Sequence, residues 1–371
     1  MTPPDRDPVR AALIRCAKAA AWSARAPALE PLPALGTLVE AARAQHALAI
    51  VGRTLRALPD CPEPLRFELE RIDRGTWATH VVTSAALGPV LAAAATTGIR
   101  VVAYKGAALA ARWYDEPWTR AMSDVDVLVS PTDEARFHAL LNSSGFTIVA
   151  SPLGRSWSAR ASHERTFSPG APGARLLDVH TAPAPPARYR FVVAEMIARA
   201  RPGVLFDAPV HLLTPEDELL VMAANQAYDH FRFGLLRFLD AWLLTERSPI
   251  DWGLLIDTAH RAGAATAAWL TLSNARRIAD VHVSDDVLAR LRPSAPRRAW
   301  LRALLDTNDW GEPRLPLPRR IEQALLVYPT VDRSRDFVRF VTFHGRLRAL
   351  DAWQEYQRRF RERRRPDQPA R

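Results

Sequence analysis

The spacing of apolar and polar positions divides the chain into helical ends and a mixed centre. Residues 8–58 repeat apolar positions at helical spacing, with a proline-rich break at 26–33. Residues 64–98 predict one or two long helices. The region 99–181 changes to short apolar runs of strand length, and from Thr214 to about Arg364 the helical period returns almost without interruption. This order predicts an α+β fold, in which a small sheet lies between helical regions.

Within the centre, the pattern predicts five strands and two helices. The strands are expected at 99–104, 124–129, 146–150, 163–167 and 175–181, and the helices at 107–114 and 131–142. Thr214-Pro215-Glu216-Asp217 predicts a helix start, with a capping hydroxyl, proline at the first helical position and acids behind it. We divide the chain into an N-terminal helical region (1–75), a catalytic domain (76–212), a C-terminal helical domain (213–357) and a basic tail (358–371).

Composition places the chain among globular, reduced proteins. It has 371 residues, of which 48% are apolar, enough for two or three domains. The apolar run at 85–99 is too short and too weakly hydrophobic to predict a membrane span, and residues 1–10 lack the apolar core of a secretory signal. Only Cys16 and Cys61 are present, without metal-type spacing, so we expect a cytoplasmic location and no membrane partner.

Basic residues are unevenly distributed. The net charge is +10, but the tail from Arg358 to Arg371 supplies half of it, so the body is only mildly basic. That tail is either solvated or bound to RNA or an acidic partner. Of 50 Lys and Arg residues, only Lys18 and Lys105 are lysines. Lys105 lies beside Gly106 at the end of a predicted strand, where its compact charge is suited to contact a phosphate oxygen. The alternative is an ordinary surface lysine.

Two aspartates lie one residue apart in the predicted strand 124–129. Because successive side chains of a strand point to opposite faces, Asp124 and Asp126 share one face, about 7 Å apart along the strand. Two such carboxylates repel unless a cation lies between them, and oxygen ligands of this kind suit Mg²⁺ together with substrate phosphates. The alternative is an ordinary solvated strand face.

A third carboxylate strengthens this interpretation. Asp178 lies on the predicted strand 175–181, and His180 shares its face. Three carboxylates from two neighbouring strands can hold two Mg²⁺ ions about 4 Å apart, an arrangement that stabilises in-line displacement at phosphorus. His180 either positions a phosphate or is a partly buried histidine. His163 lies on the next predicted strand, and we expect it to have no role.

Taken together, these motifs resemble the bacterial "uncharacterised nucleotidyltransferase" family of the DNA polymerase β-like nucleotidyltransferase superfamily. The resemblance runs from about Ala78 to Ala279. The motifs that carry it are Lys105-Gly106, Trp113-Tyr114, Arg120, Asp124-x-Asp126, Leu177-Asp178-Val179-His180, Leu213-Thr214-Pro215-Glu216-Asp217 and Arg237-Phe238-Leu239-Asp240. The resemblance implies a polymerase β-like core, a small mixed sheet with helices, flanked by N-terminal helices and a C-terminal helical domain.

The resemblance also implies a role for each matching residue. Asp124 and Asp126 would be ligands of both metal ions, and Asp178 would bind the catalytic ion and help to deprotonate the acceptor. Contacts to the nucleotide are implied for Lys105, Gly106, Arg120, Ser123 and His180. Many superfamily members carry Gly-Ser at the turn, whereas here Ala107 follows Gly106, so no hydroxyl is available there. For Arg120 a structural ion pair is an equal alternative.

From the sequence we therefore expect a transferase that binds an NTP such as ATP. Two Mg²⁺ ions, or Mn²⁺ in their place, would support transfer of its NMP group to an acceptor with release of pyrophosphate. The acceptor is unidentified; the weak basicity of the body favours a small molecule, peptide or protein over nucleic acid. The alternative is a non-catalytic RNA- or protein-binding module on the same fold. Nothing in the sequence indicates an oligomeric state.

Overall fold

The computed structural model describes residues 7–29, 31–149, 163–229, 231 and 234–305, with parts of 325–353. The basic tail predicted at 358–371 lies outside these residues. The N-terminal part is helical: α1 (Pro8–Ala21), η1 (Ser23–Arg25), α2 (Leu35–Ala44), α3 (Leu48–Arg56) and α4 (Glu63–Thr96). Asp7 begins α1 because its carboxylate accepts the Val9 N–H at 2.9 Å and proline occupies the first helical position.

The central part alternates strands and helices. Its elements are β1 (Val102–Tyr104), α5 (Lys105–Trp113), η2 (Pro117–Thr119), β2 (Asp124–Leu128), α6 (Glu134–Ser143), β3 (Thr147–Ile148), β4 (Glu164–Ser168), β5 (Leu176–His180), α8 (Val193–Arg199), β6 (Arg201–Leu205) and β7 (Ala208–Leu212). The seven strands form one mixed sheet in the order β3-β4-β5-β2-β1-β7-β6. The α+β fold class is therefore confirmed.

The C-terminal part is helical again. It comprises α9 (Pro215–Tyr228), α10 (Gly234–Arg247), α11 (Trp252–Ala262), α12 (Ala265–Ala279), α13 (Asp285–Leu291) and α14 (Ala295–Leu304), followed by helical residues at 328–330 and 334–343. The predicted start of α9 is confirmed: the Thr214 hydroxyl accepts the Asp217 N–H at 3.4 Å, and Pro215 is the first helical residue.

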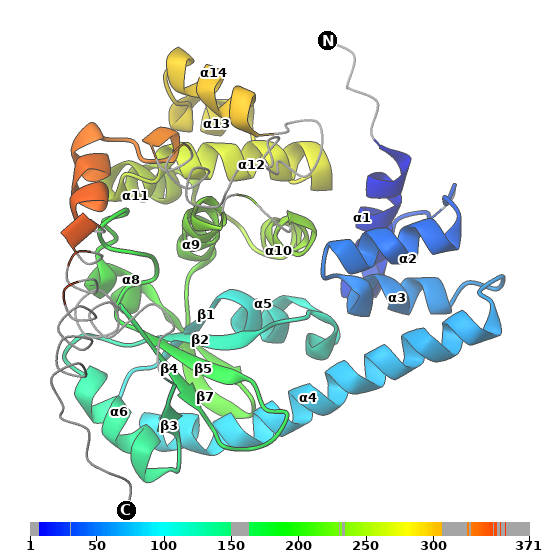
Figure 1. The fold of residues 1–371 in the computed structure, drawn as a ribbon, viewed down its shortest axis with the longest axis horizontal. Coiled ribbons are helices and arrows are strands. Elements are labelled where there is room, and N and C mark those ends of the chain that lie inside the picture. The colour runs from blue at the N-terminus through cyan, green and yellow to red at the C-terminus, as the bar shows by residue number, and fades with distance from the viewer. Residues whose placement is uncertain are drawn as a thin grey trace, which may run out of the picture.

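The two faces of the sheet bury different elements. On one face, apolar residues of β1, β2 and β5 pack with α4 and α6, in a core that includes Leu91, Val127 and Phe137. On the other face, Tyr104 and Leu128 pack with α8 and α9. Because side chains alternate along β2, the face that carries Leu128 also carries Asp126 and Asp124. The acidic residues therefore lie on the α8–α9 side of the sheet. Figure 1 shows where α8 and α9 lie relative to the strands.

The helical ends of the chain share one core. Leu13 and Ile50 from the N-terminal helices belong to the same buried apolar cluster as Leu239 and Leu272 from α10 and α12. A hydrogen bond of 3.4 Å from the Leu235 N–H to the Gln45 side chain joins these regions as well. Figure 1 shows α1–α3 beside α10, with α4 running from them along the sheet.

Helix α4 is the single long helix that was one of the two forms predicted for 64–98. It is continuous over 34 residues, and the domain boundary predicted at residue 75 falls inside it. By length and composition it is apolar enough to cross a membrane, with a window of mean hydropathy 1.4, whereas the prediction made from sequence considered the run at 85–99 alone. In the fold, Leu87, Val90 and Leu91 pack against the sheet, and core helices pass the same criterion.

The structure also contains a hairpin that the pattern did not predict. β6 and β7 are antiparallel and joined by Phe206 and Asp207, which have φ of +52° and +59°. The carbonyl oxygen of Phe206 lies so close to α4 that a Cβ at Gly88 would come within 2.7 Å of it. The glycine therefore lets the hairpin turn pack directly on α4.

Candidate active site

Sheet register brings the predicted site residues into one row. Asp126 of β2 is paired with Tyr104 of β1 on one side and with Asp178 of β5 on the other, and Asp178 is paired with Thr166 of β4. The side chains of paired residues lie on one face at close spacing. The parallel pairing of β2 with β5 is therefore what places two carboxylates from distant sequence segments next to each other.

Asp126 is the best-partnered carboxylate of the site. It is 6% exposed, and its Oδ1 lies 2.7 Å from Lys105 Nζ and 2.9 Å from His180 Nε2. Burial alone would raise the pKa of Asp126, but the Lys105 ammonium and His180 outweigh burial and hold that pKa well below its usual range. Asp126 is therefore a buried anion stabilised by two nitrogen donors.

Asp178 and Asp124 lack comparable partners. Asp178 is 9% exposed, and its Oδ1 has no hydrogen-bond partner within the described part of the chain. Burial raises the pKa of Asp178 to about 6. Burial and the neighbouring Asp126 likewise raise the pKa of Asp124, although Ser123 donates a hydrogen bond to it. Both carboxylates are in surroundings where a bound cation would favour the ionised form.

One group of ligand atoms is close enough for a single ion. An oxygen of Asp126, an oxygen of Asp178 and a ring nitrogen of His180 lie within 4.8 Å of one another. Asp124 lies outside this group, two residues earlier on the same face of β2. The donor atoms are mainly carboxylate oxygens, which are ligands that Mg²⁺ and Mn²⁺ prefer.

The turn between β1 and α5 is held in an unusual backbone conformation. Lys105 has φ of +56°, a left-handed value that costs free energy in a non-glycine residue. Its N–H donates a 2.6 Å hydrogen bond to Oε1 of Glu218 in α9. Burial raises the pKa of Glu218 to about 8. A residue of the C-terminal helical region thus fixes the turn that carries the site lysine.

Arg120 forms the structural ion pair that was its alternative role. Its Nε and Nη2 both bind the carboxylate of Asp240 in α10, at 2.9 Å and 2.6 Å, and the hydroxyl of Tyr114 donates to the same carboxylate at 2.6 Å. Asp240 is 1% exposed. A Cβ at Gly106 would lie 2.6 Å from Arg120 Nη1. Arg120 therefore links the segment before β2 to α10 and packs over Gly106; its contact with phosphate stays a prediction.

Two partners of the site were not identified from sequence. Glu218 and Asp240 come from α9 and α10, and each lies more than a hundred residues from the group it binds. A partial signal for both residues is present, because Asp240 ends one of the motifs of the resemblance and Glu218 immediately follows another.

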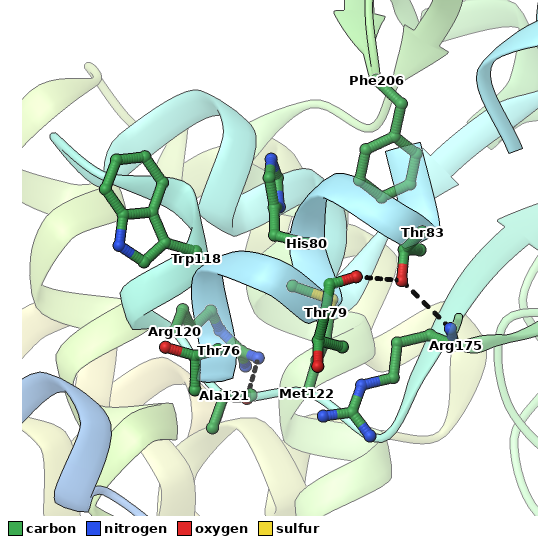
Figure 2. A pocket seen from close by; sticks show the side chains of 10 residues that line it. All are labelled: Thr76, Thr79, His80, Thr83, Trp118, Arg120, Ala121, Met122, Arg175 and Phe206. Carbon is green, nitrogen blue, oxygen red and sulfur yellow. Dashed lines mark hydrogen bonds between the residues drawn. The ribbon is translucent and has the colours of Figure 1, made fainter. Parts of the chain in front are cut away.

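A hollow lies between α4 and the segment before β2. Its empty volume is about 330 Å³, part of it open to solvent, and it is lined by Thr76, Thr79, His80, Thr83, Trp118, Arg120, Ala121, Met122, Arg175 and Phe206. Figure 2 shows α4 forming one wall and the 118–122 segment another. The lining contains none of the three aspartates, so we assign the hollow no part in the metal site.

Comparison with known proteins identifies the family. The family model described as "Uncharacterised nucleotidyltransferase" matches residues 34–280, about two thirds of the chain. The chain belongs to this family. The match confirms the resemblance seen in the sequence, and it begins earlier, within the N-terminal helices. Membership makes the protein a nucleotidyltransferase by family, and therefore a transferase.

Solved structures and curated proteins add less than the family does. The solution structure of the antibiotic-resistance factor ANT(2'')-Ia is 17% identical, covers 61% of this chain and 96% of its own, and has a TM-score of 0.31. The crystal structure of ANT(2")-Ia in complex with adenylyl-2"-tobramycin is 16% identical, covers 56% and 96%, and has a TM-score of 0.28. At these scores the likeness carries no argument about substrates. No curated protein matches the chain.

Proposed function

We propose that this family member is an Mg²⁺-dependent nucleotidyltransferase that transfers the NMP group of an NTP to an acceptor and releases pyrophosphate. Membership of the family supports the reaction class. The observation that carries the proposal for this chain is the convergence of Asp126 and Asp178, paired across β2 and β5, beside Lys105 and with Asp124 on the same face.

The residues of the site suit a divalent cation. The buried Oδ1 of Asp178 has no hydrogen-bond partner among the described residues, and burial raises the pKa of both Asp178 and Asp124. A cation between these carboxylates would compensate for both features. Asp124, Asp126 and Asp178 would hold the ions, with Mn²⁺ as the alternative to Mg²⁺. When bound, such ions polarise phosphate oxygens and neutralise the charge that develops on the attacking and leaving oxygens.

The chain's own groups supply positioning and proton transfer. The Lys105 side chain is 27% exposed and its ammonium lies beside Asp126, so it can reach a phosphate oxygen from its fixed turn. Asp178 is the proton acceptor: its carboxylate, paired beside Asp126, takes the proton of the acceptor hydroxyl. As the acceptor oxygen bonds to the α-phosphorus, the bond from that phosphorus to the pyrophosphate oxygen breaks.

The acceptor is proposed only as a class. A hydroxyl on a small molecule, peptide or protein agrees with the mild basicity of the body of the chain, since a long nucleic-acid track needs many phosphate contacts. ATP is the first nucleotide to test, and the other NTPs follow.

Pyrophosphate release tests this proposal. Wild-type protein, Asp126→Asn and the exposed control Asp60→Asn would be incubated with each NTP, Mg²⁺ and panels of hydroxyl compounds, peptides and RNA. We expect release by wild type and Asp60→Asn, and a rate at least about a hundredfold lower in Asp126→Asn. Equal release by Asp126→Asn would reject the assignment. A salt-sensitive RNA complex that depends on residues 358–371, without pyrophosphate release, would support the non-catalytic alternative.

A further inference from the structure

The hollow between α4 and the segment before β2 has the features of a separate binding site. None of the side chains that line it is acidic, and two of them are arginines, Arg120 and Arg175. Arg175 immediately precedes β5, and Figure 2 shows its side chain extending toward the wall that α4 forms. Because part of the hollow is open to solvent, a small molecule has access to these side chains.

The two arginines differ in how their charges are balanced. Arg120 binds the carboxylate of Asp240 through Nε and Nη2, so its charge is compensated within the protein. No carboxylate of the described residues forms an ion pair with Arg175, and the buried Nε of Arg175 has no hydrogen-bond partner among them.

The surroundings of Arg175 favour an anion. Its backbone is held against α4, because its N–H donates a 3.0 Å hydrogen bond to the hydroxyl of Thr83. A partly buried guanidinium that lacks an acidic partner is stabilised by an anion from outside the chain. Its planar set of N–H donors matches the oxygens of a phosphate or a carboxylate.

Aromatic side chains form another part of the lining. The ring centroid of His80 lies 6.4 Å from that of Trp118 and 5.6 Å from that of Phe206. In Figure 2 these three rings lie above the guanidinium of Arg175. Burial lowers the pKa of His80, with Asp207 acting in the opposite direction, so the imidazole is neutral at neutral pH. The hollow therefore combines an uncharged aromatic surface with an uncompensated cation.

We infer that this hollow binds a small organic anion in which a phosphate or carboxylate group is attached to a flat ring. Arg175 binds the anionic group, and the ring packs against Trp118 and His80. Arg120 separates this site from the turn at Lys105, because it lines the hollow and also packs over Gly106. The inference does not depend on nucleotidyl transfer, since none of the three aspartates lines the hollow.

Calorimetric titration of the full chain with model anions, in the absence of NTP and metal ions, tests the inference. Phenyl phosphate and benzoate each combine a ring with an anionic group, whereas inorganic phosphate, acetate and phenol each have only one of these parts. We expect phenyl phosphate or benzoate to bind at one site, at least about tenfold more tightly than any of the three partial compounds. The stronger of the two identifies the anionic group that the site prefers.

Two variants and one control locate the binding. Arg175→Gln and Trp118→Leu should each weaken it at least about tenfold, and thermal unfolding checks that each variant folds. The control Arg74→Gln should bind as wild type does, because Arg74 is 68% exposed, paired with Glu70 and on another face of α4. Failure of wild type to bind either compound, or unchanged binding in a folded Arg175→Gln or Trp118→Leu variant, would overturn the inference.

Discussion

Gly106 occupies a position where a side chain has no space. A Cβ at this residue would lie 2.6 Å from Nη1 and 3.4 Å from Cζ of Arg120, and 3.6 Å from Cβ of Met122. A flexible arginine could normally move away, but Nε and Nη2 of this guanidinium are bound to Asp240, and Nη1 donates to the Ala121 carbonyl. The glycine therefore allows the first turn of α5 to lie against the Arg120–Asp240 pair.

The substitution Gly106→Ala should lower the free energy of unfolding by about 1–3 kcal/mol, because the methyl group forces Arg120 or α5 to shift. The matched control is Gly75→Ala in the middle of α4, where nothing lies within 4 Å of the added Cβ. That change should stabilise the protein by up to about 1 kcal/mol through helix propensity. Urea unfolding measures both. A Gly106→Ala variant as stable as wild type would contradict this account of the turn.

Buried Glu218 gives a prediction about pH. Its pKa is raised by burial from 4.5 to about 8, so between these values the folded protein holds a proton that the unfolded chain has lost. This contribution to stability is complete below pH 4.5 and is lost as the pH rises through about 8. The loss amounts to about 1 kcal/mol per pH unit in that window.

Urea unfolding across this pH window checks the prediction for Glu218. Glu218→Gln should flatten the decline in stability, since the amide oxygen can still accept the Lys105 N–H but has no proton to lose. Glu40→Gln, whose side chain is 75% exposed, should retain the wild-type slope. Identical slopes in wild type and Glu218→Gln would show that the carboxyl is ionised throughout.

At the scale of elements, the Arg120–Asp240 pair ties the segment before β2 to α10. The side chains are 11% and 1% exposed, and the Tyr114 hydroxyl adds a third hydrogen bond to the carboxylate. Asp240→Asn leaves the buried guanidinium without its counter-charge, which should cost about 3–5 kcal/mol. Asp133→Asn breaks the exposed pair with Arg136 and should cost no more than about 1 kcal/mol. Thermal unfolding compares the stabilities of the Asp240→Asn and Asp133→Asn variants. An equal loss of stability in the two variants would reject a special role for the buried pair.

The elements found from sequence and those missed differ in the strength of their local signals. The strand at 124–128 and the helix starting at Thr214 have clear periodicity and a clear cap, and both were predicted. The β6–β7 hairpin was missed because prolines at 202 and 209 disfavour a strand, and because its turn uses Phe206 and Asp207 instead of the usual asparagine and glycine.

The same difference, between what a local sequence pattern shows and what depends on tertiary packing, applies to the residues of the site. Alternation along a strand could place Asp124 with Asp126, and Asp178 with His180, but only the parallel pairing of β2 with β5 sets Asp126 beside Asp178. The contacts of Glu218 and Asp240 depend on how α9 and α10 pack on the sheet domain, and no local pattern contains that information.

At the scale of the whole molecule, both helical ends build one body around the catalytic sheet. The shared apolar core joins α1 and α3 to α10 and α12, and α9 extends from that core to the turn at Lys105. The hydrogen bond from Lys105 to Glu218 therefore couples the stability of the shared helical core to the backbone geometry of the turn at Lys105. Asp178 is the carboxylate whose function can be separated from folding, because its Oδ1 has no hydrogen-bond partner among the described residues.

Binding of a non-hydrolysable ATP analogue, measured by calorimetry with and without Mg²⁺, tests the central claim most directly. Wild type and the exposed control Asp60→Asn should bind the analogue only with Mg²⁺. Asp178→Asn should bind at least about tenfold more weakly yet unfold at no lower temperature, because it replaces a buried carboxylate oxygen that has no hydrogen-bond partner among the described residues. Binding that does not require Mg²⁺ and is unchanged in Asp178→Asn would contradict the metal-dependent nucleotidyl-transfer site.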